Sequence, residues 1–184
     1  MRIIRFKKIG STQNYAKKIA EKSVSETIVL AQKQTNGRGQ FERGWSSSKG
    51  GLYFSIILKP KIDIKCQPDK IPALTLKMAA AIIDTIKIEK PKIFIKPPND
   101  IMVRWKMEDG RWKNKKVAGI LTESSVTCNK IDWIVVGVGV NINNKIPKEL
   151  KKIAVSLKEI TKKNGNVKKI FKEIVKKFVK TNRT

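Results

Sequence analysis

The sequence has no histidine among its 184 residues. Relays of the Ser-His-Asp or Cys-His kind are therefore impossible, and so is a histidine-ligated zinc site. Cysteine is almost as scarce. Cys66 and Cys128 are single and far apart, which suits a reducing cytoplasm better than the alternative of a chance disulfide. An enzyme built on this chain must work by positioning and electrostatic stabilisation, or with magnesium held by a carboxylate.

Long apolar runs and acidic residues are missing too. No run approaches the roughly 20 apolar residues that span a bilayer, and residues 1–6 turn polar too quickly for a secretory signal. Only 15 acidic residues oppose 41 lysines and arginines, so the net charge is +26. Such a charge attracts polyanions. Lysine is nevertheless spread along the whole chain, so we expect mostly solvated lysine faces.

The hydrophobic pattern predicts a single α+β domain with a mixed, largely antiparallel sheet packed with helices. Helical spacing predicts a capped helix from Ser11 to about Lys22, and a mostly apolar helix over 71–87. A turn is predicted at 108–110. Apolar runs and alternation predict strands at 27–31, 51–59, 92–96, 100–105, 116–123 and 132–140.

The C-terminal segment is strongly basic. Residues 145–184 carry fourteen cations and three acids. Apolar residues from Val167 to Val179 recur at helical spacing opposite lysines, which predicts a basic amphipathic helix over about 167–181, beyond a core of 1–157. Such helices can bind membranes or nucleic acid. We favour a terminal helix that docks on the core and leaves its lysines in solvent.

The segment from Gln34 to Gly51 is the clearest sign of function. It holds five glycines, three cations and Trp45 between two strand-like runs. Glycines let backbone amides approach an anion, arginines match carboxylate and phosphate oxygens, and the indole offers a stacking face for a base. The segment is typical of a site for a nucleotide or an acyl-phosphate.

Two further segments place polar residues where elements meet. Residues 11–13, Ser-Thr-Gln, put hydroxyls at a helix start, although an N-cap alone would explain them. Residues 96–100, Lys-Pro-Pro-Asn-Asp, put a cation and two polar side chains at a corner between strands, as a plain turn also would. Each is a weak signal by itself.

Two predicted strands contain glycines. The strand that begins at Lys116 carries Gly119, which indicates a bulge or close ligand approach, while its lysines could simply protect an edge. In the last strand, Gly137, Gly139 and Asn141 share one face because side chains alternate. That face has room for a flat ligand.

In this order and spacing, the five segments resemble the motifs of biotin protein ligases across roughly residues 9–157. The family pattern runs Ser-Thr-Asn, Gln-x-x-Gly-Arg-Gly-Arg-x-Gly-Arg-x-Trp, Lys-Trp-Pro-Asn-Asp, Lys-(Leu/Val/Ile)-Ala-Gly-Ile-Leu and Gly-x-Gly-x-Asn. A P-loop is excluded because Gly-x-x-x-x-Gly-Lys-(Ser/Thr) is absent. The resemblance implies a catalytic domain related to the class II aminoacyl-tRNA synthetase architecture. The matching segments are 11–13, 34–45, 96–100, 116–121 and 137–141, with a further similarity at 154–157.

The resemblance implies an ATP- and Mg²⁺-dependent ligase that forms biotinyl-5′-AMP and transfers biotin to a lysine of a biotin carboxyl carrier domain. Catalytic roles are implied for Arg38, Lys116, Lys96 and Asp100, with Asp100 also a candidate magnesium ligand. Biotin contacts are implied for Ser11, Thr12, Gln13, Gln34, Arg38, Lys116 and Gly119. Contacts with ATP or the adenylate are implied for Gly37, Arg38, Gly39, Gln40, Arg43, Trp45, Lys96, Asn99, Lys116, Gly137, Gly139 and Asn141.

The sequence departs from the family pattern at Gln40, Glu42 and Pro97, where the family has arginine, glycine and tryptophan. Because Gln40 is neutral and shorter than arginine, it predicts looser retention of the adenylate. Neither a winged helix nor a small C-terminal β-barrel is recognisable in 1–184, so DNA binding is not expected. The implied carrier is acidic, and a homodimer is compatible with the resemblance.

Three alternatives stay open. The first is a lipoate or octanoyl transferase of the same superfamily, although the Gln-x-x-Gly-Arg-Gly run argues against it. The second is a basic nucleic-acid-binding domain, supported only by charge. The third is a catalytically weak ligase, suggested by Gln40 and Pro97.

Overall fold

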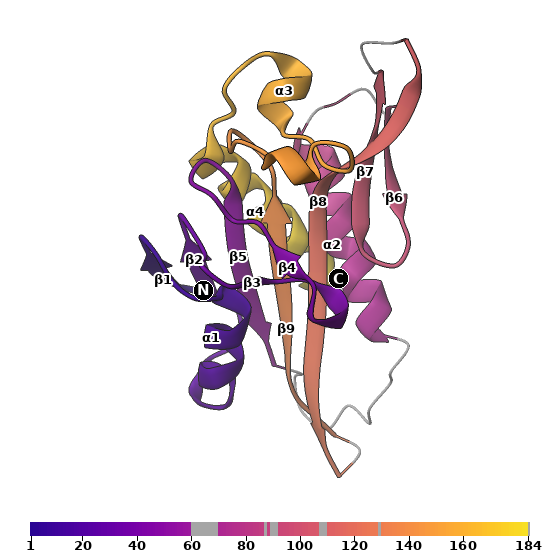
Figure 1. The fold of residues 1–184 in the computed structure, drawn as a ribbon. Helices are drawn as coiled ribbons and strands as arrows, with labels where there is room; N and C mark the ends of the chain where they lie inside the picture. The colour runs from indigo at the N-terminus through magenta and orange to yellow at the C-terminus, as the bar shows by residue number, and fades with distance from the viewer. Residues whose placement is uncertain (60–69, 87, 89–91, 107–109, 129, 184) are drawn as a thin grey trace.

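The computed structural model describes residues 1–59, 70–86, 88, 92–106, 110–128 and 130–183 (Figure 1). Within them, a seven-stranded sheet has the order β1-β2-β5-β9-β8-β7-β6. The pair β1–β2 is parallel and the other neighbouring pairs are antiparallel. The strands are β1 (Arg2–Phe6), β2 (Thr27–Ala31), β5 (Leu52–Leu58), β6 (Ile93–Lys96), β7 (Asp100–Lys106), β8 (Trp112–Thr127) and β9 (Lys130–Val140).

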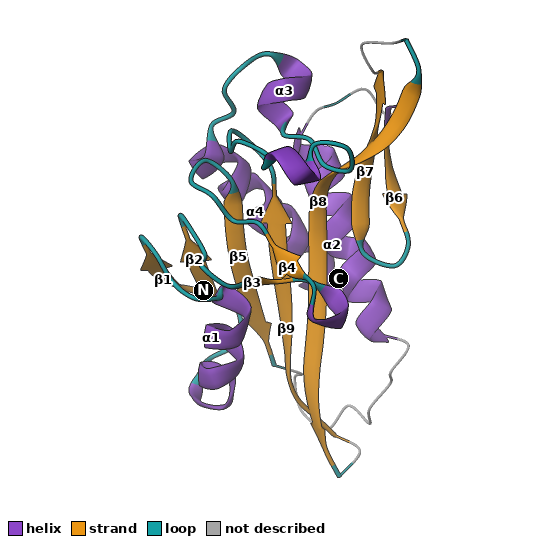
Figure 2. Ribbon diagram, in the orientation of Figure 1, coloured by secondary structure: helices purple, strands orange, loops and turns teal. Residues whose placement is uncertain are grey.

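Helices cover both faces of the sheet, as Figure 2 shows. The long helices α2 (Lys70–Ile86) and α4 (Val167–Arg183) pack on the rear face, where Phe54 and Phe171 meet edge to face at 5.4 Å. The shorter α1 (Thr12–Ile19), extended by the 3-10 turn η1 (Ala20–Lys22), packs on the front face against Val29, Ile57 and Val135. Alternation along each central strand supplies both faces with apolar side chains.

A small ribbon crosses the front face (Figures 1 and 2). It pairs β3 (Gly37–Arg38) with β4 (Gly44–Trp45), and its tip is the turn η2 (Gln40–Glu42). Phe41 at the tip has a φ of 51° and is 86% exposed. The rest of the front face is bordered by η4 (Lys148–Leu150) and α3 (Leu157–Thr161). This front face carries the candidate site.

The expected α+β class with a largely antiparallel sheet is confirmed, and each predicted strand is present. Two differences stand out. The edge strand β1 was not predicted, because its arginines interrupt the apolar run and its order comes from parallel pairing with β2. The strand β8 begins at Trp112 rather than at 116, since its first residues are mostly polar. Most of the predicted turn at 108–110, and Cys66 of the alternative disulfide, lie outside the described residues.

The helix α4 docks by its apolar side. Phe171, Ile174, Val175 and Phe178 are buried in the main core cluster, while the lysines between them are mostly exposed. No helix in the described ranges is both long and apolar enough to cross a membrane.

Candidate active site

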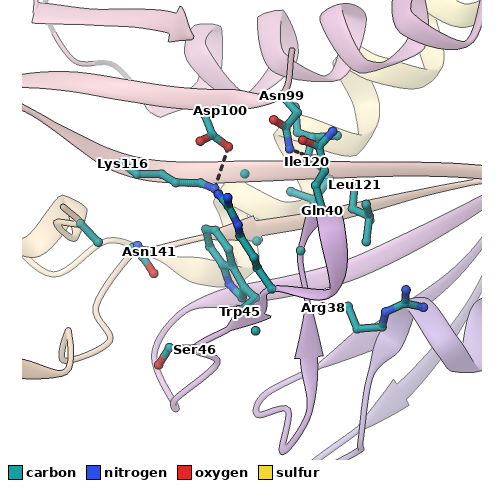
Figure 3. Close-up of a pocket in the computed structure, with 18 of the residues that line it drawn as sticks. Arg38, Gln40, Trp45, Ser46, Asn99, Asp100, Lys116, Ile120, Leu121 and Asn141 are labelled. Atoms are coloured by element: carbon teal, nitrogen blue, oxygen red, sulfur yellow. Dashed lines mark hydrogen bonds and ion pairs between the residues drawn. The ribbon is translucent and has the colours of Figure 1, made fainter. Parts of the chain in front are cut away.

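A cavity of about 630 Å³ opens on the front face of the sheet (Figure 3). Its walls come from the start of α1, the ribbon β3–β4, the corner between β6 and β7, the middle of β5 and β8, and the C-terminal end of β9. Residues 146–154 complete the rim. The cavity has two chemically different ends, which we call the α1 end (Ser11, Thr12, Gln13, Gln34 and Ser55) and the Lys116 end (Trp45, Asp100, Lys116, Gly119 and Gly139).

Neutral hydrogen bonds organise the α1 end. Gln34 Oε1 accepts from the Thr12 backbone N–H at 2.7 Å and from Thr12 Oγ1 at 3.0 Å. The other side of the Gln34 amide donates to Ser47 Oγ at 2.8 Å. Ser55 Oγ lies 3.0 Å from both Thr12 Oγ1 and Gln13 Oε1, and its single proton can be donated to either. Ser11 caps α1 by accepting from the Asn14 backbone N–H.

Gln13 is held from several sides. Its Nε2 lies 2.9 Å from Glu123 Oε2, 3.3 Å from the Val135 carbonyl and 3.4 Å from the Leu121 carbonyl. A Cβ added at Gly137 would collide with Gln13 Oε1. The room that Gly137 leaves on the sheet face is therefore filled by a side chain from α1.

At the Lys116 end, Gly119 and Gly139 likewise leave room for a side chain from a distant segment. Gly119 on β8 lies opposite Gly139 on β9, and a Cβ at either position would collide with the indole of Trp45. The flat group that lies on these glycines is therefore the indole itself. Trp45 Nε1 is buried without a hydrogen-bond partner among the described residues. Lys116 Nζ covers the ring at 4.9 Å from its centroid.

Lys116 is fixed at both its backbone and its side chain. Its backbone N–H donates to the Ile153 carbonyl at 2.8 Å, and its carbonyl accepts from the Val155 N–H at 3.1 Å. Its Nζ lies 2.6 Å from Asp100 Oδ1 (Figure 3). Next to Asp100, the Asn99 side-chain amide donates to the Ile120 carbonyl at 2.8 Å, which ties the β6–β7 corner to β8. This corner therefore positions a cation and a carboxylate in one wall.

Arg38 does not join Lys116. Its Nη1 lies 3.0 Å from Asn14 Oδ1 and 3.7 Å from Glu123 Oε1, and Figure 3 shows the guanidinium pointing away from Lys116 and Asp100. Lys17 Nζ also pairs with Glu123, at 2.7 Å. Burial raises the pKa of Glu123, but the hydrogen bonds from Lys17 and Gln13 and the charges of Lys17 and Arg38 outweigh it, so the pKa lies below 4.5.

Each candidate residue from the sequence lines the cavity except Gly37, which is buried at the base of the ribbon. Arg43 and Lys96 lie exposed at the rim, and Asn141 accepts a hydrogen bond from Asn144 at 3.0 Å. The side chain of Glu42 lies outside the described part of the chain.

Sequence reasoning missed several participants: Ser47, Ser55, Glu123 and Asn144. Only Ser55 left a signal, as a hydroxyl inside an otherwise apolar strand. Asn144 Oδ1 resembles Trp45 Nε1 in being buried with no partner in the described ranges. Buried polar atoms are normally hydrogen-bonded, so these two atoms are suited to contact a ligand.

The fold and the cavity define an α+β ligand-binding domain in which neutral hydrogen-bonding groups and fixed cations line one cavity. The model of the biotin/lipoate A/B protein ligase family matches residues 5–141, and the chain belongs to this family.

The bifunctional ligase/repressor BirA of Bacillus subtilis is 38% identical over 157 residues, which cover 82% of this chain and 44% of BirA. The chain thus spans less than half the length of that relative. The structure of the biotin protein ligase of Aquifex aeolicus in complex with biotin and ATP is similar with a TM-score of 0.72 and 31% identity, covering 99% of this chain and 70% of that one.

A third similarity concerns the fold alone. The bipartite lipoate protein ligase of Thermoplasma acidophilum has a TM-score of 0.63 at 11% identity, over 99% of this chain and 83% of that one. The architecture is thus shared by ligases named for biotin and for lipoate, so the choice between these two substrates depends on the cavity.

Proposed function

We propose that this chain is an ATP-dependent biotin protein ligase. The observation that carries the proposal is the α1 end, where a neutral polar wall faces the same cavity as Lys116. Biotin combines a neutral ureido ring with a carboxylate, so one end of the molecule needs oriented donors and acceptors and the other needs a cation. The 38% identity to a bifunctional ligase/repressor supports the same assignment.

The proposed reaction has two steps. A carboxylate oxygen of biotin attacks the α-phosphorus of ATP, the bond to the bridging oxygen breaks, and pyrophosphate leaves. The ε-amine of an acceptor lysine then attacks the acyl carbon of biotinyl-5′-AMP. AMP leaves with the electrons of the C–O bond, the amine loses a proton, and an amide remains.

The Lys116 end would stabilise charge in the first step. Two anions approach each other there, so a fixed cation aimed at the developing charge lowers the barrier. Lys116 already faces the cavity, but its ion pair with Asp100 would have to break before its ammonium group could contact the substrate oxygens. Arg38 would have to leave Asn14 and Glu123 before it could assist. The indole of Trp45 would give the adenine ring a stacking face once Lys116 Nζ, which covers the ring, turns to the substrate oxygens.

Magnesium would enter with the nucleotide. The described residues contain no group of three or more His, Cys, Asp or Glu side chains arranged to hold a metal. Mg²⁺ is commonly bound by one or two carboxylates together with substrate phosphates. Asp100, in the cavity wall beside Lys116, fits that pattern as a protein ligand and would help to hold the phosphates in place.

The acceptor would be a biotin carboxyl carrier domain with an acidic surface, which the excess of lysine on this chain would attract. A homodimer is the assembly that the family resemblance allows, and sedimentation of the purified chain tests it.

Calorimetry with three ligands tests the proposal. Biotin should bind the wild-type chain, lipoate should not, and ATP with Mg²⁺ should add further heat once biotin is present. Lys116→Ala should abolish or greatly weaken biotin binding. Lys113 is an exposed lysine on the opposite face of β8, so Lys113→Ala should leave biotin binding unchanged. Binding of lipoate in place of biotin would overturn the assignment, as would salt-sensitive RNA binding without biotin binding.

A further inference from the structure

A second hollow lies beside the cavity, on the front face of β6, β7 and β8. It has a volume of about 380 Å³ and is lined by Phe94, Arg104, Trp112 and Asn114, which we call the shelf. Phe94 and Asn114 also line the main cavity, so the two hollows adjoin each other. The shelf has no part in the chemistry proposed above.

Strand register explains why these side chains gather. Phe94 lies opposite Met102, and Arg104 lies opposite Asn114. Ile93 and Val103, which alternate with Phe94 and Arg104 along their strands, are buried in the main core cluster. Because side chains alternate across a strand, the shelf residues must project from the front face.

The shelf exposes large aromatic surface. Phe94 is 37% exposed and Trp112 is 48% exposed. The guanidinium carbon of Arg104 lies 5.5 Å from the centroid of the Trp112 ring, so the cation is held over an aromatic face. Tryptophan and arginine are the residue types most enriched among energetically dominant contacts in protein interfaces. Exposed aromatic side chains of this kind on a front sheet face indicate an interaction surface.

The charge around the shelf selects the partner. Lys96, Arg104 and Lys106 are exposed on this strand face. Over the described residues of β6, β7 and β8, the acidic residues on this face are Asp100, which pairs with Lys116, and Glu123, which pairs with Lys17 and Arg38 at the α1 end. A surface that fits the shelf would therefore combine apolar side chains with carboxylates.

We propose that the shelf receives the acceptor protein, at the segment that flanks its target lysine. This inference rests on the proposed ligase function. In the second step the acyl-adenylate fills the cavity, so the backbone of the acceptor must stay outside while its lysine side chain reaches in. The shelf adjoins the cavity along Met102, whose strand neighbour is Lys116. Apolar side chains beside the lysine would lie on Phe94 and Trp112, and a carboxylate would meet Arg104.

The two half-reactions separate this role from catalysis. The probe is the recombinant biotin carboxyl carrier domain of an acetyl-CoA carboxylase. Trp112→Ala and Arg104→Glu should each raise KM for the carrier about tenfold or more, the size typical of an interface anchor, with kcat little changed. Biotin-dependent exchange of pyrophosphate into ATP, and transfer of biotin to hydroxylamine, should stay within about twofold of wild type because both bypass the acceptor protein.

Lys113→Glu is the matched control, since Lys113 is an exposed neighbour of Trp112 on the opposite face of β8. It changes the net charge as Arg104→Glu does and should leave KM for the carrier near the wild-type value. Unchanged KM in both shelf variants overturns the proposal. Equal losses with hydroxylamine and with the carrier also overturn it, because the shelf would then shape the cavity. Failure of wild-type exchange would instead overturn the ligase function itself.

Discussion

The two ends of the cavity differ in how completely their groups are already satisfied. At the α1 end, Ser55 is fully buried and Gln13 and Thr12 are 3% and 4% exposed, and each is hydrogen-bonded within the protein. At the Lys116 end, the side chains of Lys116 and Asp100 are 29% and 25% exposed and pair with each other. The α1 end is neutral and rigid, whereas the Lys116 end is charged and partly open to solvent.

This difference separates recognition from chemistry. A preorganised wall binds a neutral ring at little cost in side-chain entropy. Lys116 and Asp100 pair with each other, so this ion pair must break before either side chain contacts a ligand. The loss of the ion pair offsets part of what each new charged contact contributes. We therefore expect changes at the Lys116 end to affect rate most, and changes at the α1 end to affect stability and affinity most.

Lys116→Ala should produce the largest effect. Removing a fixed cation that faces developing negative charge lowers the rate by about 100-fold or more. The measurement is biotin-dependent exchange of labelled pyrophosphate into ATP. Lys113→Ala, on the other face of the same strand, should exchange at the wild-type rate. If the two variants retain equal activity, the Lys116 end is not the catalytic end.

Gly137→Ala should damage the α1 end through packing alone. The new Cβ would collide with Gln13 Oε1, and Gln13 cannot shift without losing its contacts with Glu123 and Ser55. Overpacking of this kind costs about 1–3 kcal/mol. Urea unfolding should show the loss as a lower midpoint with an unchanged slope. Gly10→Ala should leave the midpoint unchanged, because nothing lies within 4 Å of the Cβ position at Gly10. Equal midpoints for both variants would contradict this account.

Gly137 and Gly139 show which features of the site can be predicted from the sequence and which cannot. Spacing alone predicted that Gly137 and Gly139 share a face of one strand, and the strand and its face are as predicted. What fills the space could not be predicted, because Gln13 and Trp45 arrive from distant segments and their placement depends on tertiary packing. The position of Arg38 could not be predicted for the same reason, because Asn14 and Glu123, which contact it, lie outside the five motif segments.

Gln40→Arg tests whether the β3–β4 ribbon retains the adenylate in the cavity. Gln40 lines the cavity near the exposed tip at Phe41, where a longer cation could reach a phosphate. We expect release and hydrolysis of biotinyl-5′-AMP to fall about three- to tenfold, which corresponds to the roughly 0.5–1.5 kcal/mol that a typical hydrogen bond contributes. Quenched samples resolved by chromatography measure both. Gln32→Arg adds the same charge at an exposed position outside the cavity and should change neither. Equal release from Gln40→Arg and wild type would reject the retention role.

Glu123→Gln should give the smallest effect, and its pH dependence tests whether Glu123 anchors the α1 end. Lys17, Gln13 and Arg38 surround this carboxylate, and its pKa is lowered below 4.5 in the folded chain. A lowered folded pKa means that the ionised form stabilises the fold. This contribution is complete above the unfolded pKa and is lost as pH falls through the folded one.

The wild type should therefore be more stable than Glu123→Gln at neutral pH, by roughly 0.5–1 kcal/mol because the site is partly solvated. The difference should shrink as pH drops below 4.5. Urea unfolding from pH 3 to pH 7 measures it, with the exposed Glu21→Gln as the matched control that shows no such difference. A stability difference that persists undiminished at low pH would mean that shape, rather than charge, makes Glu123 matter. The charge of Glu123 would then contribute nothing to the free energy of unfolding, and the α1 end would depend on neutral contacts alone.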